Sequence, residues 1–418
     1  MLKCGRSEGV ALVLLMITSL LSCRAVSKPA VTTSAFTTTA PSAASTQVAV
    51  PNEYLDLHSA LKADLDRFDG FLKSRDTGVR YPVVFGTELL TANSNRGPDL
   101  LKPGTLQGTF VNLDSLQQMG VQGVTINVAY PVYTSDFPQY QDYVNYFKQV
   151  AAEVHRRGMK LDVEAGVVFH DTEYSPIKVD FAGLTLAKFE SDMHSMLQAI
   201  IDDLKPDYIN LGAEPDTHAS LTGIHELNNP QVYTQFVNYV LSGLERGTTK
   251  IAAGIGTWSS TAFVESLAKS TSLDCIAIHI YPVLGDYLTK AASIAETATQ
   301  YGKSIILDEC WLYKTESPPG TIAGTTAVYR LDSFSFWAPL DEQFLAGVAK
   351  LCRMYGIEYV SPFWANFFFG DLDYAAENAN LTYSETVAQS NKVAAQNIVD
   401  GKRGVLGEYY SSLIVADR

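Results

Sequence analysis

The chain has 418 residues, a net charge of −14 and 46% hydrophobic residues. This apolar fraction excludes a largely disordered chain, and the length suits one large domain once a leader and a linker are subtracted. The negative charge argues against nucleic acid and polyanionic ligands, because both require a basic surface, and it favours a neutral ligand.

The N-terminus has the features of an export signal. Lys3 and Arg6 precede an apolar run over residues 10–21, which is short for a membrane span. The run ends in LLSC at residues 20–23, which resembles the lipobox of bacterial lipoproteins. The resemblance implies that residues 1–22 are a lipoprotein signal peptide and that Cys23 carries the lipid, which would anchor the secreted protein at the outer membrane or cell surface of a bacterial envelope. An ordinary signal peptide with a chance cysteine is the alternative.

Residues 23–51 are rich in Ser, Thr, Ala and Pro and show no periodicity, so they are predicted to be a flexible linker. Residues 52–418 then form the functional domain. Cys275, Cys310 and Cys352 lie at irregular spacing in apolar segments of this domain. This pattern favours buried thiols over a disulfide framework or a zinc site.

Short β-rich runs alternate with amphipathic helical stretches along the domain, several of which end in Gly as a helix C-cap does. The predicted strands are residues 81–88, 123–130, 160–168, 207–214, 250–258, 275–282, 304–311 and 359–366, with an extra helix at residues 53–74. Such alternation indicates βαβ units and a parallel sheet, and eight units predict an α/β fold of the (β/α)8 TIM barrel type. A doubly wound open sheet is less favoured, because no Gly-rich phosphate loop follows the first strand.

In a barrel the chemistry is expected where the strands end. Residues two apart on a strand share a side. This alternation predicts which side chains face the barrel interior, and it places one pair of the seventh strand on the opposite side. The interior set is Asn210 with Gly212 and Glu214, Glu309 with Trp311, His279 with Tyr281, and Trp364 with Asn366, and the opposing pair is Asp308 and Cys310.

All four tryptophans, Trp258, Trp311, Trp337 and Trp364, fall at or shortly after predicted strand ends. Flat aromatic faces at a barrel mouth are suited to stacking on sugar rings, and this is the function that we predict for them. The alternative is that they only shield the top of the barrel.

Glu214 and Glu309 end the fourth and seventh predicted strands, so they are expected to face one another across the mouth. Cleavage of a glycosidic bond uses such a pair, with one protonated acid and one ionised carboxylate. A separation of roughly 5 Å is typical of enzymes that retain the anomeric configuration.

The motifs GAEPD (212–216), HIYP (279–282) and LDECW (307–311) together resemble the clan A (β/α)8 retaining glycoside hydrolases. The resemblance covers roughly residues 81–366 and implies that Glu214 is the acid/base, with a pKa raised by burial or by the neighbouring carboxylate, and that Glu309 is the nucleophile. It also implies that Tyr281 bonds the nucleophile and that Trp364 lies under the reacting sugar.

One departure from the clan concerns Ala213, because most members have an Asn there that bonds the 2-hydroxyl of the sugar. Asn127, Asn210 and Asn366 are all candidates to replace it. Glu88 either lines a subsite or pairs with a nearby Arg.

Glu164 and His170 follow the third predicted strand, and both residue types bind metal ions. No H-x-H or H-E-x-x-H spacing occurs, so we predict neither a metal nor another cofactor.

The predicted function is a monomeric retaining glycosidase on a neutral β-linked poly- or oligosaccharide. Long loops after the first, seventh and eighth strands favour an open cleft and internal cleavage. The predicted catalytic residues are Glu214 and Glu309, and the predicted substrate-binding residues are Tyr281, His279, Trp364, Trp311, Trp258, Asn366, Asn127 and Glu88. One alternative is a surface glycan-binding lipoprotein without chemistry. Another is a metal-dependent barrel hydrolase, which the missing ligand spacing disfavours.

Overall fold

The strands of the computed structural model form one parallel sheet. The structure describes residues 49–170, 172, 175–281, 285–316, 326–362 and 364–416, so Cys23 and the leader lie outside the described residues. Within these ranges the sheet order is β1-β9-β8-β7-β6-β5-β4-β3-β2. The strands are β1 (Val84–Phe85), β2 (Glu88–Asn93), β3 (Gly123–Asn127), β4 (Lys160–Glu164), β5 (Tyr208–Asn210), β6 (Lys250–Gly256), β7 (Cys275–Ile280), β8 (Ser304–Cys310) and β9 (Ile357–Pro362).

The sheet closes because β1 and β2 are two parts of one barrel strand. β1 pairs with β9, whereas β2 pairs with β3. Between them, the amide of Gly86 donates to Val360 O at 2.7 Å, and Thr87 O accepts from the amide of Thr125 at 3.0 Å. A side chain at Gly86 would collide with the hydroxyl of Tyr359, 2.4 Å from an ideal Cβ, so glycine permits this seam. All eight predicted barrel strands are therefore found, and the predicted (β/α)8 fold is confirmed.

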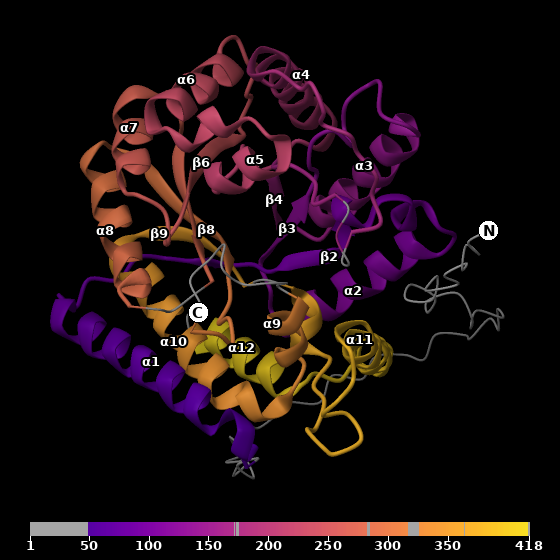
Figure 1. Cartoon of the computed structure of the whole chain (residues 1–418), viewed down its shortest axis with the longest axis vertical. Helices are drawn as coiled ribbons and strands as arrows, with labels where there is room; N and C mark the ends of the chain where they lie inside the picture. The colour runs from indigo at the N-terminus through magenta and orange to yellow at the C-terminus, as the bar shows by residue number, and fades with distance from the viewer. Residues whose placement is uncertain are drawn as a thin grey trace, which may run out of the picture.

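Helices surround the strands, and Figure 1 shows them as a ring with α1 along its outside beside α10. The helices are α1 (Leu55–Arg75), α2 (Thr105–Met119), α3 (Tyr140–Arg156), α4 (Leu186–Leu204), α5 (Pro215–Thr222), α6 (Pro230–Leu241), α7 (Ala262–Ser270), α8 (Tyr287–Gln300), α9 (Thr326–Leu331), α10 (Ala338–Tyr355), α11 (Tyr383–Asp400) and α12 (Val405–Ala416). Short 3-10 helices are η1 (Asn52–Tyr54), η2 (Ser94–Leu101), η3 (His225–Asn228), η4 (Ser335–Trp337) and η5 (Ala365–Phe368). Among the described residues, none of the helices is long and apolar enough to cross a membrane.

Local sequence explains where the helices begin and end. Asn229 caps α6, its side chain accepting from two backbone amides of the first turn, and Pro230 occupies the first helical position. Gly120 and Gly356 end α2 and α10 in the left-handed conformation, as the sequence predicts. The segment after the first strand, predicted to be a long loop over residues 89–109, is instead β2, η2 and the first turn of α2.

The barrel interior changes character from floor to mouth. Its floor is an apolar cluster that includes Tyr208, Ala252, Cys275, Ile306 and Tyr359. Above it the side chains become polar. The three cysteines of the domain are free and buried, as predicted. The floor holds the strands together, and the polar layer above it is where a site can form.

Candidate active site

The end of β5 positions Glu214. The regular strand stops at Asn210, and Gly212 has φ 138°, so the predicted alternation does not extend to Glu214. A Cβ on Gly212 would lie 2.3 Å from the ring of His218, which folds back from α5. Glu214 precedes Pro215, the first residue of α5. The carboxyl group is therefore placed by a glycine turn and a helix start rather than by the strand.

A β-bulge in β8 places Asp308 and Glu309 on the same side. Ala277 pairs with Ile306 and His279 pairs with Glu309, so two steps along β7 match three along β8. Both carboxylates consequently reach His279, with Asp308 Oδ1 3.6 Å from Nε2 and Glu309 Oε2 3.3 Å from Nδ1. The prediction that Asp308 faces away from Glu309 is wrong, because it assumed an unbroken alternation.

His279 lies between the two predicted catalytic residues. Its Nδ1 is 2.9 Å from Glu214 Oε1 and 3.3 Å from Glu309 Oε2, so these oxygens are at most about 6.2 Å apart. Thr217 donates a further hydrogen bond of 2.6 Å to Glu214 Oε2. The side chains of Glu214 and Glu309 are 18% and 13% exposed, so both have access to solvent.

The surroundings of these groups set their protonation. Burial lowers the pKa of His279, but the charges and hydrogen bonds of Asp308 and Glu214 outweigh it and raise that pKa well above its ordinary value. Burial acts to raise the pKa of Glu214, yet the hydrogen bond and charge of His279 lower it. Burial, followed by the charges of Glu214 and Glu88, raises the pKa of Glu309. The expected raised pKa of Glu214 is wrong, because its pKa is lowered, and Glu309 is the carboxyl group whose pKa is raised.

Two further carboxyl groups lie beside Glu309. Glu164 ends β4, and its carboxylate lies within 4.8 Å of ligand atoms of both His279 and Glu309. Glu88 accepts a hydrogen bond of 2.6 Å from Asn93, rather than pairing with an arginine. Burial raises the pKa of Glu88 to about 7 and that of Glu164 well above its usual range. Glu164 is predicted from the sequence only as a possible metal ligand, although its position at a strand end is the same signal that identified Glu214.

The side chains around Glu309 include types that bind metal ions. Glu164, His279 and Glu309 are spaced so that one ion could contact all three. A histidine binds a metal ion through a deprotonated ring nitrogen, however. The carboxylates around His279 raise its pKa and favour its protonated form. His170, the other metal candidate, is separate from this cluster, because its Nε2 is 3.3 Å from Leu221 O.

The aromatic side chains divide into two groups. Trp258 and Trp364 are partly exposed. Trp258 donates to Asp216 at 2.9 Å, and its ring lies 5.7 Å from that of Tyr281. Trp311 is 1% exposed and stacked on Phe367, so it has no open face for a sugar.

Trp337 is fully buried and packs against His58 of α1, away from the mouth. The prediction of stacking platforms is therefore wrong for Trp311 and Trp337, because a position after a strand does not determine which way an indole turns.

The three candidate asparagines all make hydrogen bonds to neighbouring protein groups. Asn127 accepts from the hydroxyl of Ser94, and Asn210 donates to Asp308 while accepting from the amide of Gly212. Asn366 donates to Asn391 of α11 at 2.7 Å, so it is directed away from the site, contrary to prediction. The strand ends at Pro362, and Trp364 has φ 60°, so the predicted alternation fails there as well.

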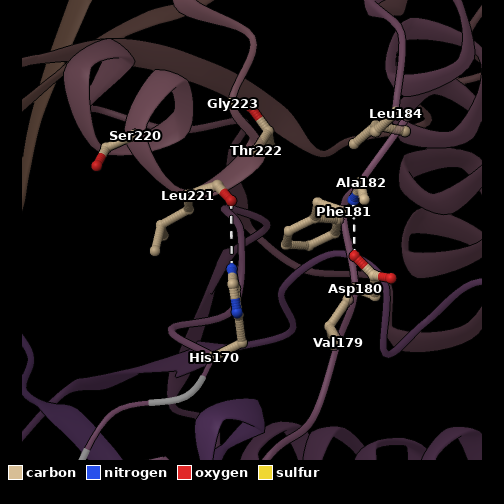
Figure 2. Close-up of a pocket in the computed structure, with 11 residues that line it drawn as sticks. His170, Val179, Asp180, Phe181, Ala182, Leu184, Ser220, Leu221, Thr222 and Gly223 are labelled. Atoms are coloured by element: carbon tan, nitrogen blue, oxygen red, sulfur yellow. Dashed lines mark hydrogen bonds between the residues drawn. The ribbon is translucent and has the colours of Figure 1, made fainter.

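An open pocket of about 540 Å³ lies between the segment after β4 and the end of α5, and neither Glu214 nor Glu309 is among its lining residues. Figure 2 shows that His170 and Phe181, from the segment after β4, face the end of α5 across it. Both walls follow the carboxyl ends of neighbouring strands. The pocket is therefore on the same face of the barrel as Glu214.

Comparison with known proteins gives a fold likeness only. The sequence matches no protein-family model and no curated protein. Among solved structures, an exo-β-1,4-mannosidase from Opitutaceae bacterium strain TAV5 aligns with a TM-score of 0.51 and 15% identity, over 81% of this chain and 60% of that one. A GH5_18 protein from Bifidobacterium longum subsp. longum, in complex with Manβ1-4GlcNAc, aligns with a TM-score of 0.50 and 12% identity, over 81% and 78%. At such low sequence identities the likeness supports the barrel fold alone, and the activity has to be inferred from the site.

Proposed function

We propose that the chain is a retaining glycoside hydrolase that cleaves β-glycosidic bonds of a poly- or oligosaccharide by double displacement. The observation that carries this proposal is the contact of one histidine nitrogen with both Glu214 and Glu309. The resulting upper limit of about 6.2 Å lies below the ~6.5–9.5 Å of inverting enzymes and accommodates the ~5–5.5 Å of retaining ones. The similar structures, an exo-β-1,4-mannosidase and a complex with Manβ1-4GlcNAc, support a β-linked substrate.

In the proposed reaction, a carboxylate oxygen of Glu309 attacks the anomeric carbon. The bond to the leaving oxygen breaks, and that oxygen takes a proton from Glu214. Water then attacks the same carbon and gives a proton to Glu214, while Glu309 departs as a carboxylate. Two inversions give net retention.

The pKa of Glu309 is raised and that of Glu214 is lowered, so a proton that Glu309 holds has to move before attack. His279 Nδ1 is positioned for this transfer because it contacts both carboxyl groups. The Nδ1 proton passes to Glu214, and the Glu309 proton replaces it on Nδ1. The total charge is unchanged, and the reactive form has an ionised nucleophile and a protonated acid.

Release of reducing sugar from a panel of glucans, galactans, mannans and xylans tests the proposal, with anomeric proton spectra of the first product. Glu309→Gln and Glu214→Gln are expected to abolish release. Glu358→Gln is the matched control, because Glu358 pairs with Lys250 at the start of β9, at the opposite end of the barrel. Activity retained in Glu309→Gln, or a first product of inverted configuration, would contradict the mechanism.

A second candidate is a glycan-binding protein without chemistry. It is favoured by the free-state protonation, which is the reverse of the reactive form, and by Ala213, which offers no side-chain hydrogen bond beside Glu214. Saturable binding of a polysaccharide from the panel with no product after prolonged incubation would support this candidate over the hydrolase.

Finer features of the proposal have separate tests. Internal cleavage predicts a ladder of intermediate products rather than single sugars. The net charge supports a neutral rather than an anionic polymer. We also propose a lipid anchor at Cys23 in a bacterial envelope and a monomeric state, which acyl labelling of Cys23→Ser and light scattering would test.

A further inference from the structure

The site holds more carboxyl groups than a pair of catalytic acids requires. Carboxyl side chains come from four segments of the barrel, and within the described ranges the ion pairs of Glu214, Asp308 and Glu309 all run to His279. The titratable groups of the cluster are Glu88, Asp162, Glu164, Glu214, His218, His279, Asp308 and Glu309. The cluster therefore has an excess of acid over base.

Four carboxyl oxygens of this cluster are buried and have no hydrogen-bond partner in the described part of the chain, namely Glu88 Oε2, Asp162 Oδ1, Glu164 Oε1 and Asp308 Oδ1. Glu88 and Glu164 are only 1% and 5% exposed. A carboxyl oxygen of Glu164 lies within 4.8 Å of a ligand atom of Glu309, and the charge of Glu88 acts on Glu309. A buried polar atom without a partner is costly, so a ligand that donates hydrogen bonds is expected there.

The place of these oxygens indicates which part of a sugar they would meet. Glu309 is the proposed nucleophile at C1, and C2 is bonded to C1, so a substituent on C2 lies beside Glu309 and its neighbour Glu164. Two of the amides that were candidates to bind a 2-hydroxyl are engaged elsewhere, Asn210 with Asp308 and Asn366 with Asn391. The groups beside Glu309 include the carboxyl groups of Glu164 and Glu88.

We propose that the site binds a sugar with a protonated 2-amino group, as in β-linked glucosamine, and that Glu164 and Glu88 receive the ammonium. This inference rests on the proposed function for the position of C1. It narrows the substrate class, because the overall charge argues only against anionic polymers, whereas the interior carboxyl groups favour a positive reacting sugar. An ammonium has three donors and carries the charge that the cluster lacks.

Binding of an ammonium group to this cluster should release protons, which can be measured. Burial raises the pKa of Glu88 to about 7 and that of Glu164 well above its usual range, which favours the protonated forms in the free site. An ammonium nearby favours the ionised carboxylates, so binding must release protons. A neutral sugar gives no such release.

The experiment compares two β-1,4-linked oligomers that differ only at C2, glucosamine oligomers and the corresponding glucose oligomers. Calorimetry of the full protein at about pH 6, where Glu88 is protonated, is repeated in buffers of different ionisation enthalpy to count released protons. We expect glucosamine oligomers to bind at least about tenfold more tightly and with proton release. Glu164→Gln and Glu88→Gln should each weaken this binding about tenfold and change glucose oligomer binding less than about threefold, whereas Glu358→Gln should change neither.

The outcomes separate the two proposals. Binding of glucosamine oligomers with these signatures but without cleavage supports the amino-sugar site and contradicts the hydrolase. Cleavage of glucose oligomers without tighter binding of glucosamine oligomers supports the hydrolase and contradicts the amino-sugar site. The amino-sugar site is overturned if both oligomers bind equally or not at all. It is also overturned if Glu164→Gln weakens the binding of both oligomers equally. Tight binding of Mn²⁺ or Mg²⁺ alone that Glu164→Gln abolishes also overturns it, because the cluster would then be a metal site.

Discussion

Replacing His279 by Gln tests the electrostatics of the site most directly. A Gln amide can still donate to Glu214, but the positive charge is lost. A hydrogen bond to a charged partner contributes roughly 1.5–3 kcal/mol, against about 1 kcal/mol for a neutral one, so the change removes about 1–2 kcal/mol. Because one pKa unit corresponds to about 1.4 kcal/mol, the pKa of Glu214 should rise by about one unit.

Two assays read this shift. In the pH profile of kcat/KM, the acidic limb should move upward by about one unit, because the lowered pKa of Glu214 sets that limb and the raised pKa of Glu309 sets the alkaline one. The plateau should fall about a hundredfold, since proton transfer through the imidazole is lost. A profile identical to that of the wild type would refute the assignment of His279 as the group that controls Glu214.

Stability should change with pH in the same variant. In the wild type the lowered pKa of Glu214 stabilises the fold above the unfolded pKa of about 4.3, and this contribution is lost as the pH falls through the folded value. In His279→Gln the charge that chiefly opposes burial is lost, although Thr217 still donates to Glu214, so the folded pKa rises and this contribution to stability shrinks. Urea unfolding should therefore show a larger loss at pH 7 than at pH 4, and an equal loss at both would contradict the argument.

Other substitutions probe the framework around the site. Lys314 is fully buried and paired with two buried aspartates, so Lys314→Met should lower the free energy of unfolding by about 3–5 kcal/mol, and an unchanged urea midpoint would be inconsistent with a buried ion pair. Gly212→Ala should cost more than about 1–3 kcal/mol and reduce kcat, because the left-handed backbone and a histidine ring both oppose a Cβ; full activity in this variant would show that the turn can relax. Trp258→Ala should raise KM with little loss of stability, whereas Trp311→Ala should cost about 3–5 kcal/mol in urea unfolding, and the opposite pattern would reverse their assigned places.

The fold could be predicted because its signals are local and repeated. Each strand is a short apolar run, and Gly120 and Gly356 end their helices as expected. The ends of the strands also located Glu214 and Glu309 correctly at one mouth. These inferences needed only periodicity and the rule that barrel sites lie at the carboxyl ends of strands.

The finer geometry could not be predicted, because it depends on irregular backbone and distant partners. The bulge in β8 turns Asp308 toward His279, and nothing in the letters LDEC marks it. The reversed protonation of Glu214 follows from a histidine 65 positions away in the chain. The burial of Trp311 follows from Phe367, which belongs to η5, far away in the sequence.

The buried acids also bear on how this protein would respond to laboratory evolution. Glu88 and Glu164 each keep an oxygen without a partner inside the barrel, which opposes folding in the absence of a ligand. Changing either residue to a neutral side chain of the same shape should relieve that conflict. A screen that rewards heat resistance alone would therefore enrich variants with a damaged site, and selection for stability has to be coupled to selection for binding.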